Sequence, residues 1–133
     1  MMQLEAYLAS SPLPKPLLHL VKLRASQING CAFCVDMHSI EARDDGESFA
    51  RIQAVAVWQE APCFTPAERA ALALTESATR LPDQQDRVPD EVWAEAAGHF
   101  NEATLAALVM AIATINAWNR IAVAGRLVPQ SFR

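Results

Sequence analysis

Apolar residues recur at steps of three and four along almost the whole sequence, in segments separated by glycine, proline and helix-capping residues. This periodicity is typical of helices that bury one face. No segment rich in Val, Ile and Thr alternates with period two, and the Asn29-Gly30 pair does not join two strand-like runs. We therefore expect an all-α bundle of about six to seven helices, forming a single domain over residues 1–133.

Start and stop signals place the boundaries of these helices. The expected segments are 2–10, 16–30, 31–45, 48–58, 66–80, 90–100 and 102–126. The clearest start is Thr65-Pro66-Ala67-Glu68, which combines an N-cap, a proline at the first helical position and a capping glutamate. In the second segment, Lys22 and Arg24 are expected to face water. The core candidates of the third segment are Val35, Met37 and Ile40.

Charge and composition limit the partners and the compartment. A formal net charge of −4 and a pI near 5.3 argue against nucleic acid and anionic membranes as partners. The first residues have neither a basic region nor a long apolar run, so no leader is expected. Three cysteines, two of them only three residues apart, do not make a secreted disulfide framework. We expect a soluble, cytoplasmic protein.

Two thiols and an imidazole stand at helical spacing in the middle of this pattern. On an α-helix, Cys31, Cys34 and His38 fall within about 60° of one another and share one stripe. Asn29-Gly30 predicts that one helix stops just before them, so that the thiols begin the next helix. Unpaired N–H groups and the helix dipole favour a thiolate there, which predicts a reactive site.

The run from Leu20 to His38 resembles the signature of the AhpD-like alkylhydroperoxidases, within the carboxymuconolactone decarboxylase superfamily. The stretches 54–58, 65–74 and 115–120 are similar to that family as well, so the resemblance covers nearly the whole chain. It implies the all-α AhpD-like bundle and thiol-dependent reduction of peroxides, an antioxidant activity. It also implies a small hydroperoxide as substrate, a thiol reductant as partner, and neither cofactor nor metal.

The resemblance also assigns roles to individual residues. It implies that Cys34 attacks the peroxide and becomes a sulfenic acid, and that Cys31 resolves this acid into a redox-active disulfide. His38 then matches the imidazole of the proton relay. The chemistry is reasonable in itself, because a thiol three residues away can reach the sulfenic acid before further oxidation does.

One position departs from the family pattern. The family carries a relay glutamate twelve residues before the first cysteine, and this chain has His19 there. A histidine can accept and pass protons, so His19 is a candidate relay residue. On that interpretation, His19→Glu keeps or raises peroxide turnover and His19→Leu lowers it. If the relay is broken instead, a disulfide reductase or a redox sensor with weak peroxidase activity is expected.

Other interpretations of these residues stay open at this point. Cys31, Cys34 and His38 are also zinc ligands, although a closed structural site needs a fourth ligand and the sequence offers no second Cys-x-x-Cys. A non-redox member of the superfamily is a further alternative. Glu41 lies on the Cys34 side of its helix and is either a proton partner or simply solvated. Cys63 is expected to pack as a small apolar residue, and His99 to be structural.

The apolar content predicts self-association. Apolar residues make up 52% of the chain, and the segment from Leu105 to Ala117 has no charge. A monomer would expose a larger apolar patch than soluble monomers usually do. We expect a homo-oligomer, a hexamer or a trimer by the resemblance, with the Cys helix near an interface. Trp58, Trp93 and Trp118 are expected in the core or at an interface.

Overall fold

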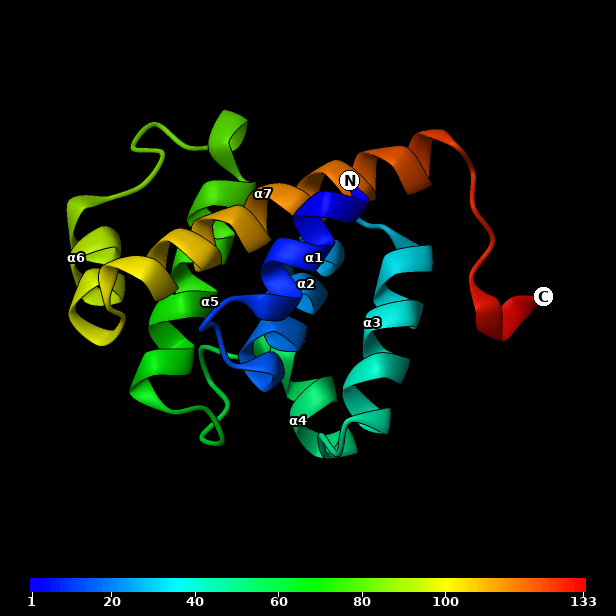
Figure 1. The fold of residues 1–133 in the computed structure, drawn as a ribbon, viewed down its shortest axis with the longest axis horizontal. Helices are drawn as coiled ribbons and strands as arrows, with labels where there is room; N and C mark the ends of the chain where they lie inside the picture. Colours follow the sequence, from blue (N-terminus) through cyan, green and yellow to red (C-terminus); the bar gives the residue numbers. More distant parts are fainter.

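The computed structural model describes all 133 residues, and it is an all-α bundle without strands (Figure 1). Its helices are α1 (Met2–Ser10), α2 (Lys15–Ile28), α3 (Ala32–Asp44), α4 (Phe49–Ala54), α5 (Pro66–Thr79), α6 (Asp90–His99) and α7 (Glu102–Ala124). Short 3₁₀ turns follow α4 at Val55–Val57, follow α5 at Leu81–Asp83 and end the chain at Gln130–Phe132. The expected fold class and the seven helical segments are confirmed. Only the fourth segment differs, because its α-helix tightens to 3₁₀ geometry before Trp58.

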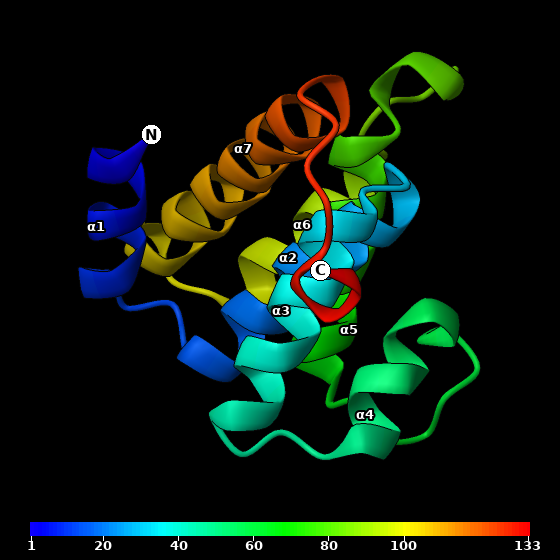
Figure 2. The ribbon, with the colours of Figure 1, turned by 90° about the vertical axis from the view of Figure 1, so that its right-hand side faces the viewer.

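Helix α2 lies at the centre of the bundle and packs against α3, α5 and α7, while α1 packs against α7 (Figures 1 and 2). All seven residues from Leu17 to Leu23 are buried, so no side of this stretch is left for water. The expectation that Lys22 and Arg24 face water is therefore wrong. Lys22 is only 8% exposed, and Arg24 is half-buried in an ion pair with Glu76 of α5.

A tight turn joins α2 to α3 and sets where α3 begins. Gly30 adopts the left-handed conformation with φ of 67°. The Gly30 N–H donates to the Gln27 carbonyl at 3.2 Å, and the Cys31 N–H donates to the Ser26 carbonyl at 3.0 Å. These two bonds form a Schellman motif, which satisfies the last carbonyls of α2. Cys31 thus closes one helix and caps the next.

A buried polar network fixes this turn to α7. The Asn29 side chain donates to both Asn116 and Asn119 at 2.9 Å. Asn119, 1% exposed, donates in turn to the Ser26 hydroxyl at 3.0 Å. Because these buried amides are paired, they hold the start of α3 in one position against α7.

Helix α7 packs one face against the bundle and leaves part of the other open. Its buried face includes Leu108, Ala111, Ile112 and Ile115. Val109, Ile121 and Val123 are at least 40% exposed. By length and composition alone α7 could cross a membrane, a test that core helices of soluble proteins also pass. In this fold it contacts α1, α2, α3, α5 and α6.

The segment after α7 runs back across α3 (Figure 2). The Ser131 N–H donates to the Asp36 carboxylate at 3.0 Å, and its hydroxyl donates to the other oxygen at 2.5 Å. These hydrogen bonds hold the pKa of Asp36 below its usual value. The C-terminal segment is thereby attached to the half of α3 that carries the thiols.

Candidate functional site

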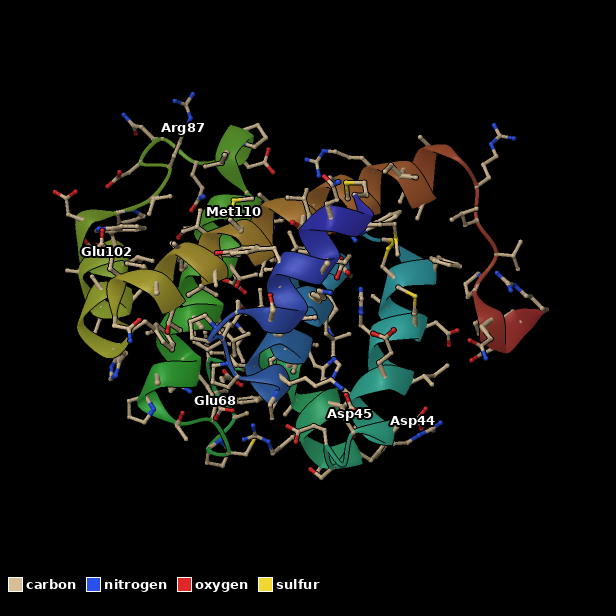
Figure 3. The ribbon with its side chains drawn as sticks, in the orientation of Figure 1. Asp44, Asp45, Glu68, Arg87, Glu102 and Met110 are labelled. Carbon is tan, nitrogen blue, oxygen red and sulfur yellow. A yellow bond between two sulfur atoms is a disulfide. The ribbon has the colours of Figure 1, made fainter.

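The first turn of α3 brings the two thiols together. Cys31 is the N-cap, and the Cys34 N–H donates to the Cys31 sulfur at 3.2 Å. The two residues form a disulfide with Cα atoms 5.3 Å apart, drawn in yellow in Figure 3. Cys31 is 1% exposed and Cys34 is 2% exposed, so both sulfurs are buried although they lie at the start of a helix. The two cysteines pack together with Ala122 of α7, and Phe33 packs against them.

One turn further along α3, His38 is also buried, at 4% exposed. Its Nδ1 atom lies 3.1 Å from a carboxylate oxygen of Glu41, whose side chain is half-exposed. That hydrogen bond lowers the pKa of Glu41, although partial burial acts in the opposite direction. The Nε2 atom of His38 is buried and has no hydrogen-bond partner.

The buried stripe of α3 is Cys34, His38 and Ala42. The expected core candidates Val35, Met37 and Ile40 are only partly buried.

A cavity of about 420 Å³ opens beside Cys34 and His38. Its apolar lining comes from α1, α3, α7 and the segment that follows α7, namely Met2, Phe33, Met37, Trp118, Ala122 and Leu127. Glu5, Lys22 and Glu41 supply the polar part of the wall. Cys31 is not among the lining residues. Of the two cysteines, therefore, only Cys34 faces this space.

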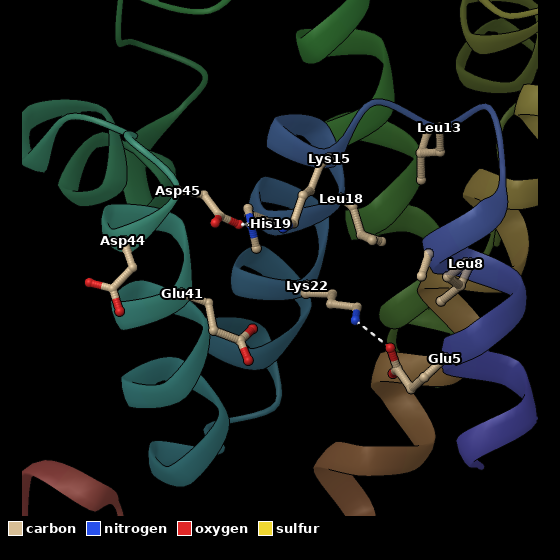
Figure 4. A pocket seen from close by; sticks show the side chains of 11 residues that line it. Glu5, Leu8, Leu13, Lys15, Leu18, His19, Lys22, Glu41, Asp44 and Asp45 are labelled. Carbon is tan, nitrogen blue, oxygen red and sulfur yellow. Dashed lines mark hydrogen bonds and ion pairs between the residues drawn. The ribbon is translucent and has the colours of Figure 1, made fainter.

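The polar wall contains an ion pair that the sequence did not reveal. Lys22 Nζ lies 2.8 Å from one oxygen of Glu5, and the Trp118 Nε1–H donates to the other oxygen at 3.0 Å. The pair joins α1, α2 and α7 at the cavity (Figure 4 shows Lys22 and Glu5). The available signal was a lysine inside the apolar run Leu20–Leu23, which indicates either an exposed position or a buried partner.

Trp118 is half-buried, Trp58 is buried and Trp93 is 45% exposed.

His19 lies in a different place from the thiols. Its Nε2 is 2.6 Å from Asp45 at the far end of α3, and Nδ1 is buried without a partner (Figure 4). The hydrogen bond to His19 and the ion pair with Lys15 lower the pKa of Asp45. A second cavity of about 510 Å³ borders His19 and Asp45, and it shares Glu5, Lys22 and Glu41 with the first. The structure brings His38 to Cys34 but forms no hydrogen bond between His19 and either residue, and the relay role of His19 stays a prediction.

Two further candidates are settled by their surroundings. Cys63 is exposed, which contradicts the expectation that it packs as an apolar residue. The reason is that residues 62 and 63 belong to an exposed loop that Arg51 holds by a hydrogen bond to the Cys63 carbonyl oxygen. His99 is exposed and pairs with Glu95 of its own helix at 3.3 Å. No three His, Cys, Asp or Glu side chains lie where they could hold one metal ion.

Comparisons with known proteins bear on the family and the fold. Residues 1–77 match the model of the carboxymuconolactone decarboxylase family. The uncharacterised protein YdfG of Bacillus subtilis is 43% identical over 124 residues, which span 93% of this chain and 83% of YdfG.

Two solved structures show the same bundle. A protein of unknown function from Agrobacterium tumefaciens, for which a role in antioxidant defence as AhpD has been suggested, has a TM-score of 0.91. It is 44% identical, over 96% of this chain and 86% of its own. The debrominase Bmp8 has a TM-score of 0.78 at 21% identity, over 96% of this chain and 66% of its own, and so shares the fold.

Proposed function

The chain belongs to the carboxymuconolactone decarboxylase family, with the AhpD-like fold, and from that premise we propose that it is a thiol-dependent peroxidase acting through Cys31 and Cys34. One observation carries the proposal. Cys34 faces a cavity that also contains His38, while Cys31 lies within disulfide distance behind it. A nucleophile, a proton donor and a resolving thiol are therefore present in one site. The antioxidant role suggested for the Agrobacterium relative points the same way.

In the reduced protein the reaction starts at Cys34. Its thiolate attacks the terminal oxygen of a hydroperoxide, the O–O bond breaks, and the alkoxide leaves with a proton from His38. The sulfur of Cys31 then attacks the sulfenic acid on Cys34, and the proton of the Cys31 thiol passes to the departing hydroxide, so that a disulfide forms and water leaves. One hydroperoxide and two thiols yield one alcohol, one water molecule and one disulfide. An external dithiol reverses the oxidation by thiol–disulfide exchange.

The start of α3 suits this chemistry. The Cys31 sulfur already accepts a backbone N–H at the N-cap, and both sulfurs lie at the positive end of the helix dipole. The two Cα atoms are 5.3 Å apart in the disulfide, within the usual range, so this turn accommodates the product of the second half-reaction. The apolar part of the cavity suits the organic substituent of an alkyl hydroperoxide.

Intact-mass analysis of single-cysteine variants tests the proposal. In a Cys63→Ser background, which removes the exposed thiol, the Cys31→Ser and Cys34→Ser proteins are reduced and treated with one equivalent of cumene hydroperoxide. We expect a trapped sulfenic acid on Cys31→Ser, none on Cys34→Ser, and a disulfide in the parent protein. Sulfenic acid on Cys34→Ser alone reverses the two roles. An unoxidised parent protein overturns the peroxidase assignment.

The same dithiol also serves a thiol–disulfide oxidoreductase, and the buried Cys31–Cys34 disulfide is the observation that favours this second candidate. The debrominase Bmp8 has a similar fold, so the fold alone does not determine which reaction a protein catalyses. A reduced parent protein that ignores cumene hydroperoxide but reduces an aromatic disulfide reagent in the Cys63→Ser background supports the second candidate.

A further inference from the structure

His38 has two ring nitrogens in contrasting surroundings. Nδ1 is 3.1 Å from a carboxylate oxygen of Glu41, whereas Nε2 is buried and has no hydrogen-bond partner. His38 itself lines the Cys34 cavity. Leaving a buried polar atom unpaired is costly, so such atoms are rare unless something else binds them. The reacting sulfur and oxygen atoms are the natural partners for Nε2 in this cavity.

We propose that Glu41 is a positioning residue, which holds His38 with its Nε2 directed at the Cys34 site and so forms a Cys34–His38–Glu41 triad. The inference rests on the proposed function for its catalytic meaning, since only a reaction at Cys34 uses the proton on His38. The carboxylate and the imidazole are three residues apart on α3, and the thiol is four residues before the imidazole. Residues at these spacings are neighbours on one side of a helix.

Glu41 determines which nitrogen of His38 carries a proton. Its hydrogen bond with His38 holds the pKa of Glu41 below the usual value, so this carboxylate is ionised at neutral pH and can only accept. Neutral His38 must therefore carry its proton on Nδ1, which leaves the Nε2 lone pair free. Nε2 can then take the Cys34 thiol proton and return it to the leaving alkoxide. The Glu41 carboxylate stabilises the imidazolium that forms between these two steps.

No other carboxylate of the two cavities forms a hydrogen bond with His38, and Asp44 borders only the second cavity. Glu5 already accepts from Lys22 and Trp118, one donor on each oxygen. Asp45 is engaged by His19 at 2.6 Å and by Lys15 at 3.1 Å. Glu41 alone contacts His38, and it borders both cavities. The carboxylate of the site thus comes from α3 itself, whereas His19 on α2 faces Asp45.

A comparison of Glu41→Ala and Glu41→Gln with Glu95→Ala tests the proposal. Glu95 is a matched control, because it also pairs with a histidine on its own helix, His99, but far from the thiols and with a side chain 70% exposed. Three quantities are measured on reduced proteins in a Cys31→Ser, Cys63→Ser background. They are the ¹⁵N shifts of the His38 ring, the rate at which iodoacetamide alkylates Cys34, and the rate at which cumene hydroperoxide oxidises it.

The parent and Glu95→Ala proteins are expected to show His38 protonated on Nδ1. Glu41→Ala is expected to lose that preference and to be alkylated and oxidised about tenfold more slowly. Glu41→Gln keeps the shape without the charge and is expected to be oxidised at least threefold more slowly, which guards against a loss confined to a misfolded alanine variant. Unchanged ¹⁵N shifts, or rates within twofold of Glu95→Ala for both Glu41 variants, overturn the triad.

The three readouts also separate this inference from the proposed function. If cumene hydroperoxide oxidises no protein, including the parent, the peroxidase assignment fails. In that case altered ¹⁵N shifts and slower alkylation in Glu41→Ala still support Glu41 as the residue that orients His38. If the parent is oxidised and the Glu41 variants match it, the peroxidase assignment holds and the triad is wrong.

Discussion

Gly30 is the single residue on which the geometry of the thiols depends most directly. Its φ of 67° lies in the left-handed region, where a side chain costs roughly 1–2 kcal/mol. No atom lies within 4 Å of the position that a Cβ would take, so the cost is conformational and not steric. The conformation of this one residue allows the Schellman motif that ends α2, and so places Cys31 as the N-cap of α3.

We therefore predict that Gly30→Ala lowers the free energy of unfolding by about 1–2 kcal/mol, measured by urea denaturation. Gly98→Ala is the matched control. Gly98 lies in α6 with ordinary helical geometry and open space around it, so alanine is expected to be neutral or stabilising there by up to about 1 kcal/mol. Equal effects of the two substitutions would show that the left-handed turn does not contribute.

His19 gives a second prediction at this scale. In the structure its only hydrogen-bond partner is Asp45, and that contact lies at the opposite end of α3 from Cys34 (Figure 3 labels Asp45). With Glu41 as the carboxylate of the site, we predict that His19→Leu changes the rate of oxidation by cumene hydroperoxide less than twofold. The family pattern predicts a clear loss instead. A tenfold decrease, with the thermal midpoint unchanged, would instead support the relay role of His19.

At the scale of helices, local signals explain what could be predicted. Caps, prolines and glycines mark helix ends within a few residues, which is why the boundaries of α5 and α7 were predictable. Burial depends on neighbours distant in sequence. Lys22 pairs with Glu5, which lies 17 residues away in the sequence, and Glu5 accepts a hydrogen bond from Trp118, which lies 113 residues away. A helical pattern for α2 alone cannot show that α1 covers the side carrying Lys22.

In the candidate site, too, residues of one helix could be predicted from the sequence, whereas contacts between helices could not. Cys31, Cys34 and His38 belong to one helix, so their spacing in the sequence already places them together. Glu41 was visible as a neighbour of that stripe, but only the hydrogen bond to His38 distinguishes it from a solvated glutamate. The walls that α1, α7 and the C-terminal segment contribute were beyond prediction, because they depend on how the helices pack.

The junction between α4 and α5 gives a pH-dependent prediction. Arg51 pairs with Glu68 and Glu47 at 2.6 Å, and Glu68 also completes the capping box with Thr65. Burial raises the pKa of Glu68, but the Arg51 and Thr65 hydrogen bonds outweigh it, and the net pKa is lowered from 4.5. A lowered carboxyl pKa adds stability above the unfolded value, and this stability is lost as pH falls through the folded value.

Accordingly, Glu68→Gln, which can still serve the cap, should lower the free energy of unfolding at pH 7 by about 1–2 kcal/mol. As pH falls through the lowered folded pKa of Glu68, the difference from the parent protein should shrink, because the carboxyl then becomes protonated in both states. Urea denaturation at pH 7, 5 and 3 measures the difference. A gap of the same size at pH 3 and pH 7 would mean that the ion pair with Arg51 is not its source.

For the molecule as a whole, the exposed apolar side chains predict assembly. They include Ile121 and Val123 on α7, and Leu127, Val128 and Phe132 in the C-terminal segment, each at least 46% exposed. These residues are close in sequence to the wall of the Cys34 cavity, to which Leu127 itself belongs. Burial between copies of the chain would remove this surface from water.

We predict a homo-oligomer, a trimer or a hexamer, by size exclusion with light scattering at micromolar concentration. Ile121→Glu is expected to lower the measured mass while the helical circular dichroism stays unchanged, because the residue is exposed in one chain. A wild-type mass near the 14.5 kDa of a single chain would contradict the prediction.

The burial of the disulfide also determines how electrons can return to it. At 1% and 2% exposure neither cysteine can meet the flat surface of a large redox protein, and the cavity reaches only Cys34. A slender donor, such as a thiol at the end of a flexible arm, fits this approach. It would form its transient bond with the Cys34 sulfur and release Cys31 first. The walls of the cavity would thus select the electron donor by its width, in addition to the requirement that its reduction potential be low enough.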